Sequence, residues 1–427
     1  MANSSFLGDM LTGLFDRTRR PGRAHDKRSI EALCTALLAG EGEVSSLQLS
    51  SAIVARYTTL DRSERLAFFQ FLNDSLELDV VALRDHANAY LHSGTMKDYR
   101  ALTTAAEPSR QELFRRINQS TGATEALVHM RVDLMQELAA YPALKRTDLD
   151  LVHLLRSWFN RGFLVLKQVS WDTPATILDK IVAYEAVHAI GDWEDLRRRL
   201  YPPDRRCFAY FHPSMPQEPL IFVEVALANE IPSSISDVLA ETREPHLAED
   251  TKIAVFYSIS NCQKGLRGIS FGNLLIKQVV DELRKELPQL ETFVTLSPIP
   301  RLNTWLRDQD ADDVAERVLS QSADPQEVEA IASHFLLNIK DEQGMPLDPV
   351  ARFHLGNGAR VYDVHADADL TKNGLNSSSG AMVNYLYDLK SIESNHEVFA
   401  SGGAVSASRA AKSKSKLYHS QNTANAT

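Results

Sequence analysis

The feature that most constrains the fold is the succession of elements between residues 251 and 300. A β-branched and aromatic run, "TKIAVFYSIS" (251–260), precedes a glycine-containing loop, which leads into the amphipathic segment "GNLLIKQVVDELRKELP" (272–288) and then "ETFVTLSPIP" (291–300). A strand, a loop, a helix and a second strand in this order predict a βαβ-type unit with parallel or nearly parallel strands. The helix is expected to bury Leu274, Leu275, Val279 and Leu283.

The texture of the chain changes at about residue 157. Before that point apolar residues recur at helical spacing and Pro and Gly are scarce, so residues 1–157 are predicted to form an all-α bundle. Residues 158–400 add short aromatic and β-branched runs, such as "CFAYFHP" and "PLIFVEVAL", which predict strands. The predicted fold class is α+β in two domains, a helical domain followed by an α/β domain. Residues 401–427, rich in Ser, Ala and Lys, predict a mobile low-complexity tail.

The composition argues against several classes of protein. A net charge of −10 at pH 7 disfavours a nucleic-acid-binding protein. The three cysteines, Cys34, Cys207 and Cys262, have neither the pattern of a disulfide framework nor the spacing of a metal site. No run of about 18 apolar residues occurs, so no membrane span is expected. The first 25 residues lack a signal-peptide core, and their apolar stripe is typical of a packing helix.

The loop of the βαβ unit contains "GISFG" (268–272), which fits the nucleophile-elbow pattern G-x-S-x-G with Ser270 as nucleophile. An elbow requires the strand to run directly into the serine, whereas this strand ends near Ser260 and a poor strand sequence follows. Glycines, Lys264 and Arg267 ahead of a helix N-terminus instead favour an anion-binding loop. The sequence therefore predicts a phosphate-binding loop in preference to a hydrolase serine.

An ordered set of segments resembles the malonyl-CoA decarboxylase family. The segments are "WFNRGFL" (158–164), "FYSISNCQKGLRGISFGNLLIKQVV" (256–280), "LSPIP" (296–300), "DPVARFHLGNGA" (348–359) and "NSSSGAMVNYLYDL" (376–389). The resemblance implies that the second domain has the acyltransferase-like (GNAT) fold, adapted to decarboxylation and to binding coenzyme A. It also implies that the helical domain serves in oligomerisation.

The resemblance implies a role for the glycine loop. Its backbone amides would hold the coenzyme A pyrophosphate, and the residues concerned are Arg267, Gly268, Ile269, Ser270, Phe271, Gly272 and Asn273. Animal members of the family carry a glutamate at the position of Ser270, where it supports the catalytic histidine. An obligatory nucleophile at Ser270 is incompatible with that replacement, and the sequence leaves open what orients the histidine here.

Three further residues match site residues of the family. Ser297, in "LSPIP", matches the active-site serine and is expected to hydrogen-bond substrate oxygen. His354, in "ARFHLGNG", matches the proton donor, and an imidazole that titrates near neutrality suits that role. Tyr387, in "NYLY", matches a pocket tyrosine near the acyl group. The residues alone would favour a Ser-Pro turn and a core histidine, and would equally allow a core aromatic residue at Tyr387.

Other polar residues of the matching segments are weaker candidates. His188 and His212 are interpreted as structural or pocket-lining residues. Asn357 and Asn384 are candidates for supporting the histidine or the carbonyl group. The basic runs 197–199 and 205–206 would either meet coenzyme A phosphates or form solvated helix faces.

The resemblance implies conversion of malonyl-CoA to acetyl-CoA and CO2 through an enolate that a histidine protonates. No metal or redox cofactor is expected, because the thioester carbonyl is the electron sink and coenzyme A is part of the substrate. Three alternatives stay open: an acyl-CoA N-acyltransferase, a thioesterase that depends on Ser270, and a catalytically silent coenzyme A-binding scaffold.

The expected partners are malonyl-CoA and acetyl-CoA, with no nucleic acid and no membrane. A homo-oligomer is expected, and the family often forms tetramers. The chain ends in Asn-Ala-Thr, whereas animal relatives end in the peroxisomal signal Ser-Lys-Leu, so a cytoplasmic location is expected.

Overall fold

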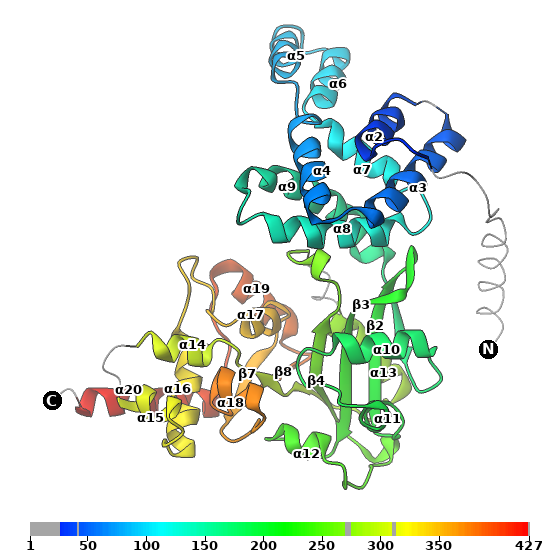
Figure 1. Cartoon of the computed structure of the whole chain (residues 1–427). Coiled ribbons are helices and arrows are strands. Elements are labelled where there is room, and N and C mark those ends of the chain that lie inside the picture. The colour runs from blue at the N-terminus through cyan, green and yellow to red at the C-terminus, as the bar shows by residue number, and fades with distance from the viewer. Residues whose placement is uncertain (1–25, 41, 270–274, 310–312, 426–427) are drawn as a thin grey trace. The chain divides into compact units, whose positions relative to one another are not determined.

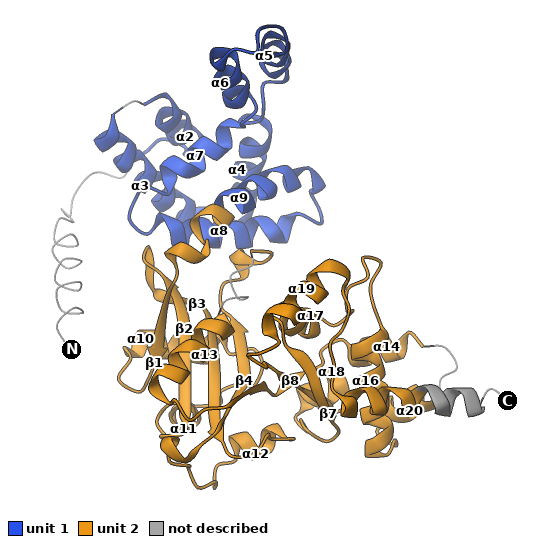
Figure 2. Ribbon diagram, turned by 180° about the vertical axis from the view of Figure 1, so that it is seen from behind, with its two compact units in different colours: residues 1–154 blue, residues 155–427 orange. Residues whose placement is uncertain are grey.

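The protein divides into two compact units with the boundary after Leu154 (Figure 2). This computed structural model describes residues 26–40, 42–269, 275–309 and 313–425, and the side chains up to residue 418 (Figure 1). The unit boundary lies three residues before the predicted one. The helix predicted within the first 25 residues, and Ser270, Phe271, Gly272 and Asn273 of the glycine loop, lie outside the described residues.

The first unit is helical, as predicted. Its helices are α2 (Ile30–Ala39), α3 (Glu43–Thr59), α4 (Arg62–Asp74), α5 (Val80–Ser93), α6 (Met96–Ala105), α7 (Ser109–Ile117), α8 (Ala123–Glu137) and α9 (Lys145–Trp158), the last of which extends past the boundary. Leu33, Phe68 and Leu113 are fully buried in this unit. Helices α5 and α6 differ from the others because neither buries a side chain, while Val80, Leu91 and Met96 are mostly exposed.

The second unit is built on a mixed sheet. Its strands are β1 (Val165–Val169), β2 (Arg205–His212), β3 (Met215–Ala228), β4 (Ile253–Asn261), β5 (Thr292–Thr295), β6 (Ser297–Pro298), β7 (Arg360–His365) and β8 (Met382–Leu386). They lie in the order β1-β2-β3-β4-β5-β8-β6, with β7 also paired to β8. The predicted βαβ unit is confirmed: β4 and β5 are parallel, and α13 (Leu275–Glu286) connects them. The other pairs are antiparallel.

Helices cover the sheet and extend it. They are α10 (Ala175–Tyr184), α11 (Trp193–Leu200), α12 (Ile235–Leu239), α14 (Leu302–Arg307), α15 (Asp313–Leu319), α16 (Pro325–Asn338), α17 (Pro349–Gly356), α18 (Lys372–Ser378), α19 (Ile392–Gly402) and α20 (Arg409–Asn425). Helices α10 and α11 pack on the face of β2 that presents Ala209 and Phe211. Helix α13 buries Leu275, Val279 and Leu283, as predicted. Its Gln278 contacts Tyr210, which lies on the face of β2 opposite to Ala209 and Phe211. None of the described helices has the length and hydropathy that a membrane span requires.

The structure corrects the prediction of a mobile tail. Residues 409–425 form helix α20, which packs along α16 and β7. Ala411, Ser415 and Tyr418 are buried, and their spacing of four and three residues places them on one helical stripe. Lys414 Nζ lies 2.6 Å from Asp363 Oδ1 and 3.1 Å from Glu329 Oε2. The sequence shows no clear helical pattern here, because two of the three buried residues, Ala411 and Ser415, are small.

We expect Ala411→Glu to destabilise the second unit and Lys412→Glu to leave it unchanged. Ala411 is fully buried, so a carboxylate there would lose its hydration without a partner, at a cost of at least about 2 kcal/mol. Lys412 is exposed on the same turn, and a change there should stay within about 0.5 kcal/mol. Denaturant unfolding measures both free energies. Equal, wild-type stability for the two variants would show that the tail is not docked.

Candidate active site

Three residues predicted from separate segments meet in the second unit. Ser297 begins β6, His354 lies on α17, and Tyr387 directly follows β8. Ser297 Oγ lies 3.2 Å from His354 Nε2, and Tyr387 Oη lies 2.8 Å from His354 Nδ1. Both ring nitrogens of the imidazole are therefore hydrogen-bonded to hydroxyl groups.

Strand β8 brings two of these residues to the histidine. It pairs with β6 through Ser297 and Val383, and with β5 through Val294 and Leu386. The backbone N–H of Tyr387 donates to Phe293 O at 2.8 Å, which fixes the tyrosine at the end of the strand. Because β6 and the end of β8 belong to one sheet, their hydroxyl groups are held at a constant separation.

His354 is a neutral imidazole at physiological pH. Its side chain is 2% exposed, and burial alone lowers its pKa to about 3, since no charged group of the described residues counteracts the desolvation. Burial also raises the pKa of Tyr387 well above its ordinary value, so that hydroxyl stays protonated. The expectation that His354 titrates near neutrality is therefore wrong, because it assumed a hydrated ring.

Thr295 and Tyr385 complete the surroundings of the pair and were not predicted. Ser297 Oγ donates to Thr295 Oγ1 at 2.8 Å, and the Tyr385 N–H donates to the same oxygen at 3.2 Å. The Tyr385 ring stacks on the imidazole, with centroids 4.6 Å apart and planes inclined by 24°. The two-residue period of a strand could have identified Thr295, which precedes Ser297 by two residues. The sequence carries no comparable signal for the stacking of Tyr385.

These contacts assign the proton positions on the imidazole. Because the Ser297 hydroxyl donates to Thr295, its oxygen accepts a hydrogen bond from His354 Nε2–H. A neutral imidazole carries one N–H, so Nδ1 is the acceptor and the Tyr387 hydroxyl donates to it. The site thus holds an Nε2–H tautomer between a donor on one side and an acceptor on the other.

A cavity of about 360 Å³ lies beside this group. Its lining residues are Ile276, Lys277, Gly356, Asn357, Tyr387, Ile392, Glu393, His396 and Glu397. Tyr387 connects the cavity to the imidazole, because its hydroxyl contacts Nδ1 directly. Lys277 belongs to the first turn of α13, so the cavity adjoins the helix that follows the glycine loop.

Two of the backbone amides that were predicted to bind pyrophosphate already make hydrogen bonds within the glycine loop. The N–H groups of Arg267 and Ile269 donate to Lys264 O and Leu266 O at 3.1 and 3.0 Å, so both amides are engaged within the loop. Gly268 has φ +82°, a conformation that favours glycine. Its carbonyl accepts from Arg156 Nη2 at 3.2 Å.

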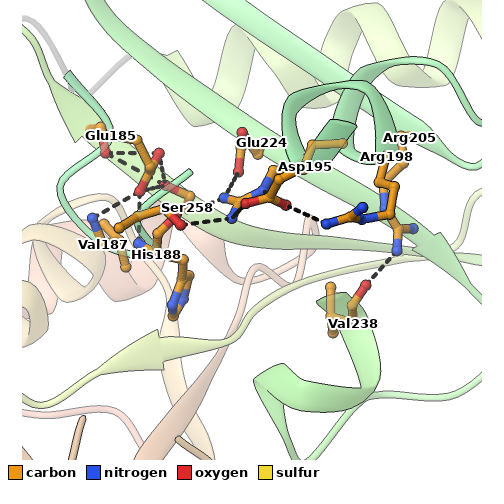
Figure 3. Close-up of polar contacts among 12 residues, drawn as sticks. Glu185, Val187, His188, Asp195, Arg198, Arg205, Glu224, Val238 and Ser258 are labelled. Atoms are coloured by element: carbon orange, nitrogen blue, oxygen red, sulfur yellow. Dashed lines mark hydrogen bonds and ion pairs between the residues drawn. The ribbon is translucent and has the colours of Figure 1, made fainter. Parts of the chain in front are cut away.

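His188 lies in a buried polar network (Figure 3). Its N–H and that of Val187 donate to Glu185 Oε1, each at 2.8 Å, and the Ser258 hydroxyl contacts the same carboxylate. Desolvation lowers the pKa of His188 to about 4. Arg199 donates to the His188 carbonyl at 2.8 Å, so this network joins α11 to the sheet.

The basic runs are not solvated faces throughout, because one arginine of each run is buried and hydrogen-bonded. Arg199 is buried and pairs with Asp195 and Glu224. Arg205 is buried and donates to Val238 O at 2.6 Å. The expectation failed because both arginines point inward from elements with an exposed and a buried side.

The remaining candidates make structural hydrogen bonds, and Asn357 also lines the cavity. His212 contacts Trp158 O through Nε2 at 3.2 Å and accepts the Ser214 N–H through Nδ1 at 3.1 Å. Asn384 donates to Thr295 O at 2.9 Å and contacts His365 Nε2 at 2.6 Å, which supports the strand beneath Ser297. Asn357 donates to Phe353 O at 2.7 Å. Within the described ranges, no three His, Cys, Asp or Glu side chains cluster as metal ligands would.

Comparison with known proteins gives one consistent family. The model for the malonyl-CoA decarboxylase N-terminal domain matches residues 76–159, and that for the C-terminal domain matches 162–325 and 320–426. Mitochondrial malonyl-CoA decarboxylase of the goose Anser anser anser is 36% identical over 344 residues, which cover 70% of this chain and 68% of that protein.

Two solved structures are similar over nearly the whole chain. Malonyl-CoA decarboxylase from Rhodopseudomonas palustris has a TM-score of 0.85 at 45% identity, covering 92% of this chain and 100% of that one. The enzyme from Agrobacterium vitis has a TM-score of 0.86 at 44% identity, covering 90% and 99%. The predicted α+β class, a helical part followed by a mixed sheet, is confirmed.

We expect the His354 imidazole to stay neutral from pH 8 to pH 5. A folded pKa of about 3, below the ordinary value of about 6.5, means that neutral His354 contributes stability fully above pH 6.5. That contribution declines as the pH falls toward 3. Nitrogen-15 NMR of histidine-labelled protein, with His354→Gln to assign the signal, follows the ring. A midpoint between pH 6 and 7 would contradict the assignment.

Proposed function

The chain belongs to the malonyl-CoA decarboxylase family, and we propose that it converts malonyl-CoA to acetyl-CoA and CO2. The observation that carries the proposal is the hydrogen-bonded series Tyr387–His354–Ser297, drawn from three separate segments and placed beside a cavity. This arrangement offers a proton and a fixed hydroxyl at one buried position, which is what protonation of a carbanion requires.

The reaction breaks the bond between the carboxylate carbon and the α-carbon of the malonyl group. The electron pair moves into the thioester carbonyl, CO2 leaves, and an enolate of acetyl-CoA remains. His354 Nε2–H then gives its proton to the α-carbon, and Nδ1 takes the proton of the Tyr387 hydroxyl. A solvent proton then returns to Nε2, and the proton on Nδ1 goes back to the Tyr387 oxygen, which restores the starting tautomer. Each turnover takes up one proton from solvent and no other reactant.

A neutral imidazole is a suitable acid for this step. The α-carbon of a thioester enolate is more basic than an imidazolate, so proton transfer from Nε2–H is favourable, and neutral histidine acids are known in enzymes. When substrate enters, the Ser297 hydroxyl turns away from Thr295 Oγ1 and donates to the carboxylate or to the developing thioester oxyanion. Such a donor is worth roughly 3–4 kcal/mol of barrier.

The glycine loop is the proposed holder of the coenzyme A diphosphate. Gly268 gives the backbone a left-handed turn immediately ahead of the segment that leads into α13. The N-terminal end of a helix favours negative charge. The cavity that Tyr387 lines beside the first turn of α13 is the proposed route by which the substrate approaches the acyl site at His354 Nε2 and Ser297. No metal or redox cofactor enters the proposed reaction.

We expect His354→Gln to lower kcat for malonyl-CoA by about 10²–10⁴, because the proton donor is lost while the pocket keeps its shape. Ser297→Ala should lower kcat by about 10²-fold or more. Release of CO2 and acetyl-CoA from malonyl-CoA without an amine acceptor measures turnover. His212→Gln, in a histidine bonded to Trp158 and Ser214, is the control and should retain activity.

The same assay separates the alternatives. An N-acyltransferase would be inactive without an amine, a thioesterase would release malonate and free coenzyme A, and a silent scaffold would bind coenzyme A without forming CO2. Wild-type turnover in His354→Gln would contradict the role proposed for the imidazole.

A homo-oligomer and a cytoplasmic location are also proposals. The α5–α6 hairpin supports the first, because it exposes Val80, Leu91 and Met96 and buries no side chain of its own in the described chain. Contiguous exposed apolar side chains mark interaction surfaces. Cell fractionation tests the location, since the goose relative is named as mitochondrial.

We expect Leu91→Glu to dissociate the oligomer, because Leu91 is 81% exposed on the hairpin and a carboxylate would be desolvated in an interface. Val44, 71% exposed on α3, provides the matched control Val44→Glu. Light scattering coupled to size exclusion measures the mass. An unchanged mass for Leu91→Glu would place the interface elsewhere.

A further inference from the structure

We propose that Asp348 is a positioning residue: its carboxylate joins the helix that carries His354 to the main chain that follows Ser297. The inference rests on the proposed function for its kinetic consequence, but the bridge itself can be tested without turnover. Asp348 contacts neither the imidazole nor the Ser297 hydroxyl among its described hydrogen bonds. It would act by fixing the distance between them.

The two oxygens of Asp348 serve two different segments. Oδ1 accepts the N–H groups of Val350 and Ala351, each at 2.9 Å, and so caps the first turn of α17. Oδ2 accepts the N–H of Arg301 at 3.3 Å. The side chain is 1% exposed, and at pH 7.5 the carboxylate is ionised because burial raises its pKa only to about 6.

Each of the two segments that Asp348 joins carries one of the reacting groups, so fixing the segment also fixes that group. Pro298 and Pro300 restrict the backbone between Ser297 and Arg301, so fixing the Arg301 amide limits the movement of the serine. On the other side, α17 is a short helix of 8 residues that begins at Pro349 and carries His354 in its second turn. A capped helix moves as a body, so the imidazole follows its N-terminus.

Within the described residues, two hydrogen bonds join the segment 297–301 to the segment 348–354: that of Ser297 with His354 and that of Arg301 with Asp348. The first must break when the Ser297 hydroxyl turns toward substrate and the imidazole delivers its proton. The second then holds the two segments together during the reaction. Displacement of reacting groups by about 1 Å can cost roughly 10²-fold in rate.

Asp348→Asn separates the bridge from the cap. Asparagine caps helices as well as aspartate does, so its oxygen can keep the two N–H groups of Val350 and Ala351. Its amide nitrogen then faces the Arg301 N–H, and two donors repel where one hydrogen bond existed. Turning the amide around would lose two bonds to regain one. The variant therefore keeps the helix and loses the bridge.

The chain offers a matched control. Asp324 is also followed by a proline and caps α16 through the N–H of Glu327 at 2.9 Å, but it is exposed. Asp324→Asn makes the same chemical change at the start of a helix that carries none of the three proposed catalytic residues.

The experiment compares steady-state kinetics with malonyl-CoA at pH 7.5 for wild type, Asp348→Asn and Asp324→Asn. We expect kcat to fall about 10- to 100-fold in Asp348→Asn. The KM and the CD spectrum should stay close to wild type, and Asp324→Asn should match wild type throughout. A kcat within twofold of wild type in Asp348→Asn, or an equal loss in both variants, would overturn the proposal.

Hydrogen exchange gives a second readout that does not need turnover. In Asp348→Asn the Arg301 amide should exchange at least tenfold faster, whereas those of Val350 and Ala351 should keep their protection. Unchanged protection of Arg301 would refute the bridge even if the enzyme acts on another substrate. Absence of CO2 release by wild type, with faster exchange at Arg301, would instead refute the proposed function alone.

Discussion

The desolvation of one imidazole is the constraint on which the site depends. His354 lies among aromatic rings and hydroxyl groups, and burial holds its pKa far below neutrality. A buried nitrogen without a partner is costly, so both ring nitrogens require hydrogen-bonding groups from elsewhere in the chain. Ser297 and Tyr387 provide them, and each is itself held by the sheet. The fold must therefore bring three distant segments together to within hydrogen-bonding distance.

Strand β8 satisfies that requirement through its neighbours. It pairs with β5, β6 and β7, so it contacts the strand that ends at Thr295, the one that begins at Ser297, and the one that follows α17. A crossover order of this kind places residues that are far apart in sequence at one end of a sheet. Short strands suffice here because their role is to set register, while the apolar core lies mainly beneath β2, β3 and β4.

The sequence predicted the long, strongly patterned parts of the fold and the chemically distinctive residues. The βαβ unit of β4, α13 and β5 carries a clear change of period, and the motifs around Ser297 and His354 are recognisable from their resemblance to a family. Strands β7 and β8 escaped prediction because "RVYDVH" and "MVNYL" are short and contain polar residues. Their existence depends on pairing with each other, which a single sequence does not display.

The protonation state of His354 escaped prediction for a similar reason. An isolated histidine titrates near neutrality, and only the packing of Tyr385 and Phe353 against the ring reveals its desolvation. The arginines 199 and 205 illustrate the converse error, since a run of charge in sequence does not tell which members turn inward. Burial is a property of the assembled fold. An expectation that assumed a hydrated side chain therefore fails wherever the fold buries that side chain.

Among the residues that the structure describes, the hydrogen bonds to the imidazole come from hydroxyl groups and not from a carboxylate, which is consistent with the chemistry proposed for it. A carboxylate at Nδ1 would favour the imidazolium form, which is a stronger acid than neutral imidazole and suits a weakly basic acceptor. An enolate carbon is a strong base, and a neutral N–H serves it while avoiding a buried charge. Tyr387 can orient the ring without adding that charge, because its own hydroxyl stays protonated. Tyr387, which follows β8, is therefore the residue that we propose to orient the histidine, and a neutral partner matches a neutral acid.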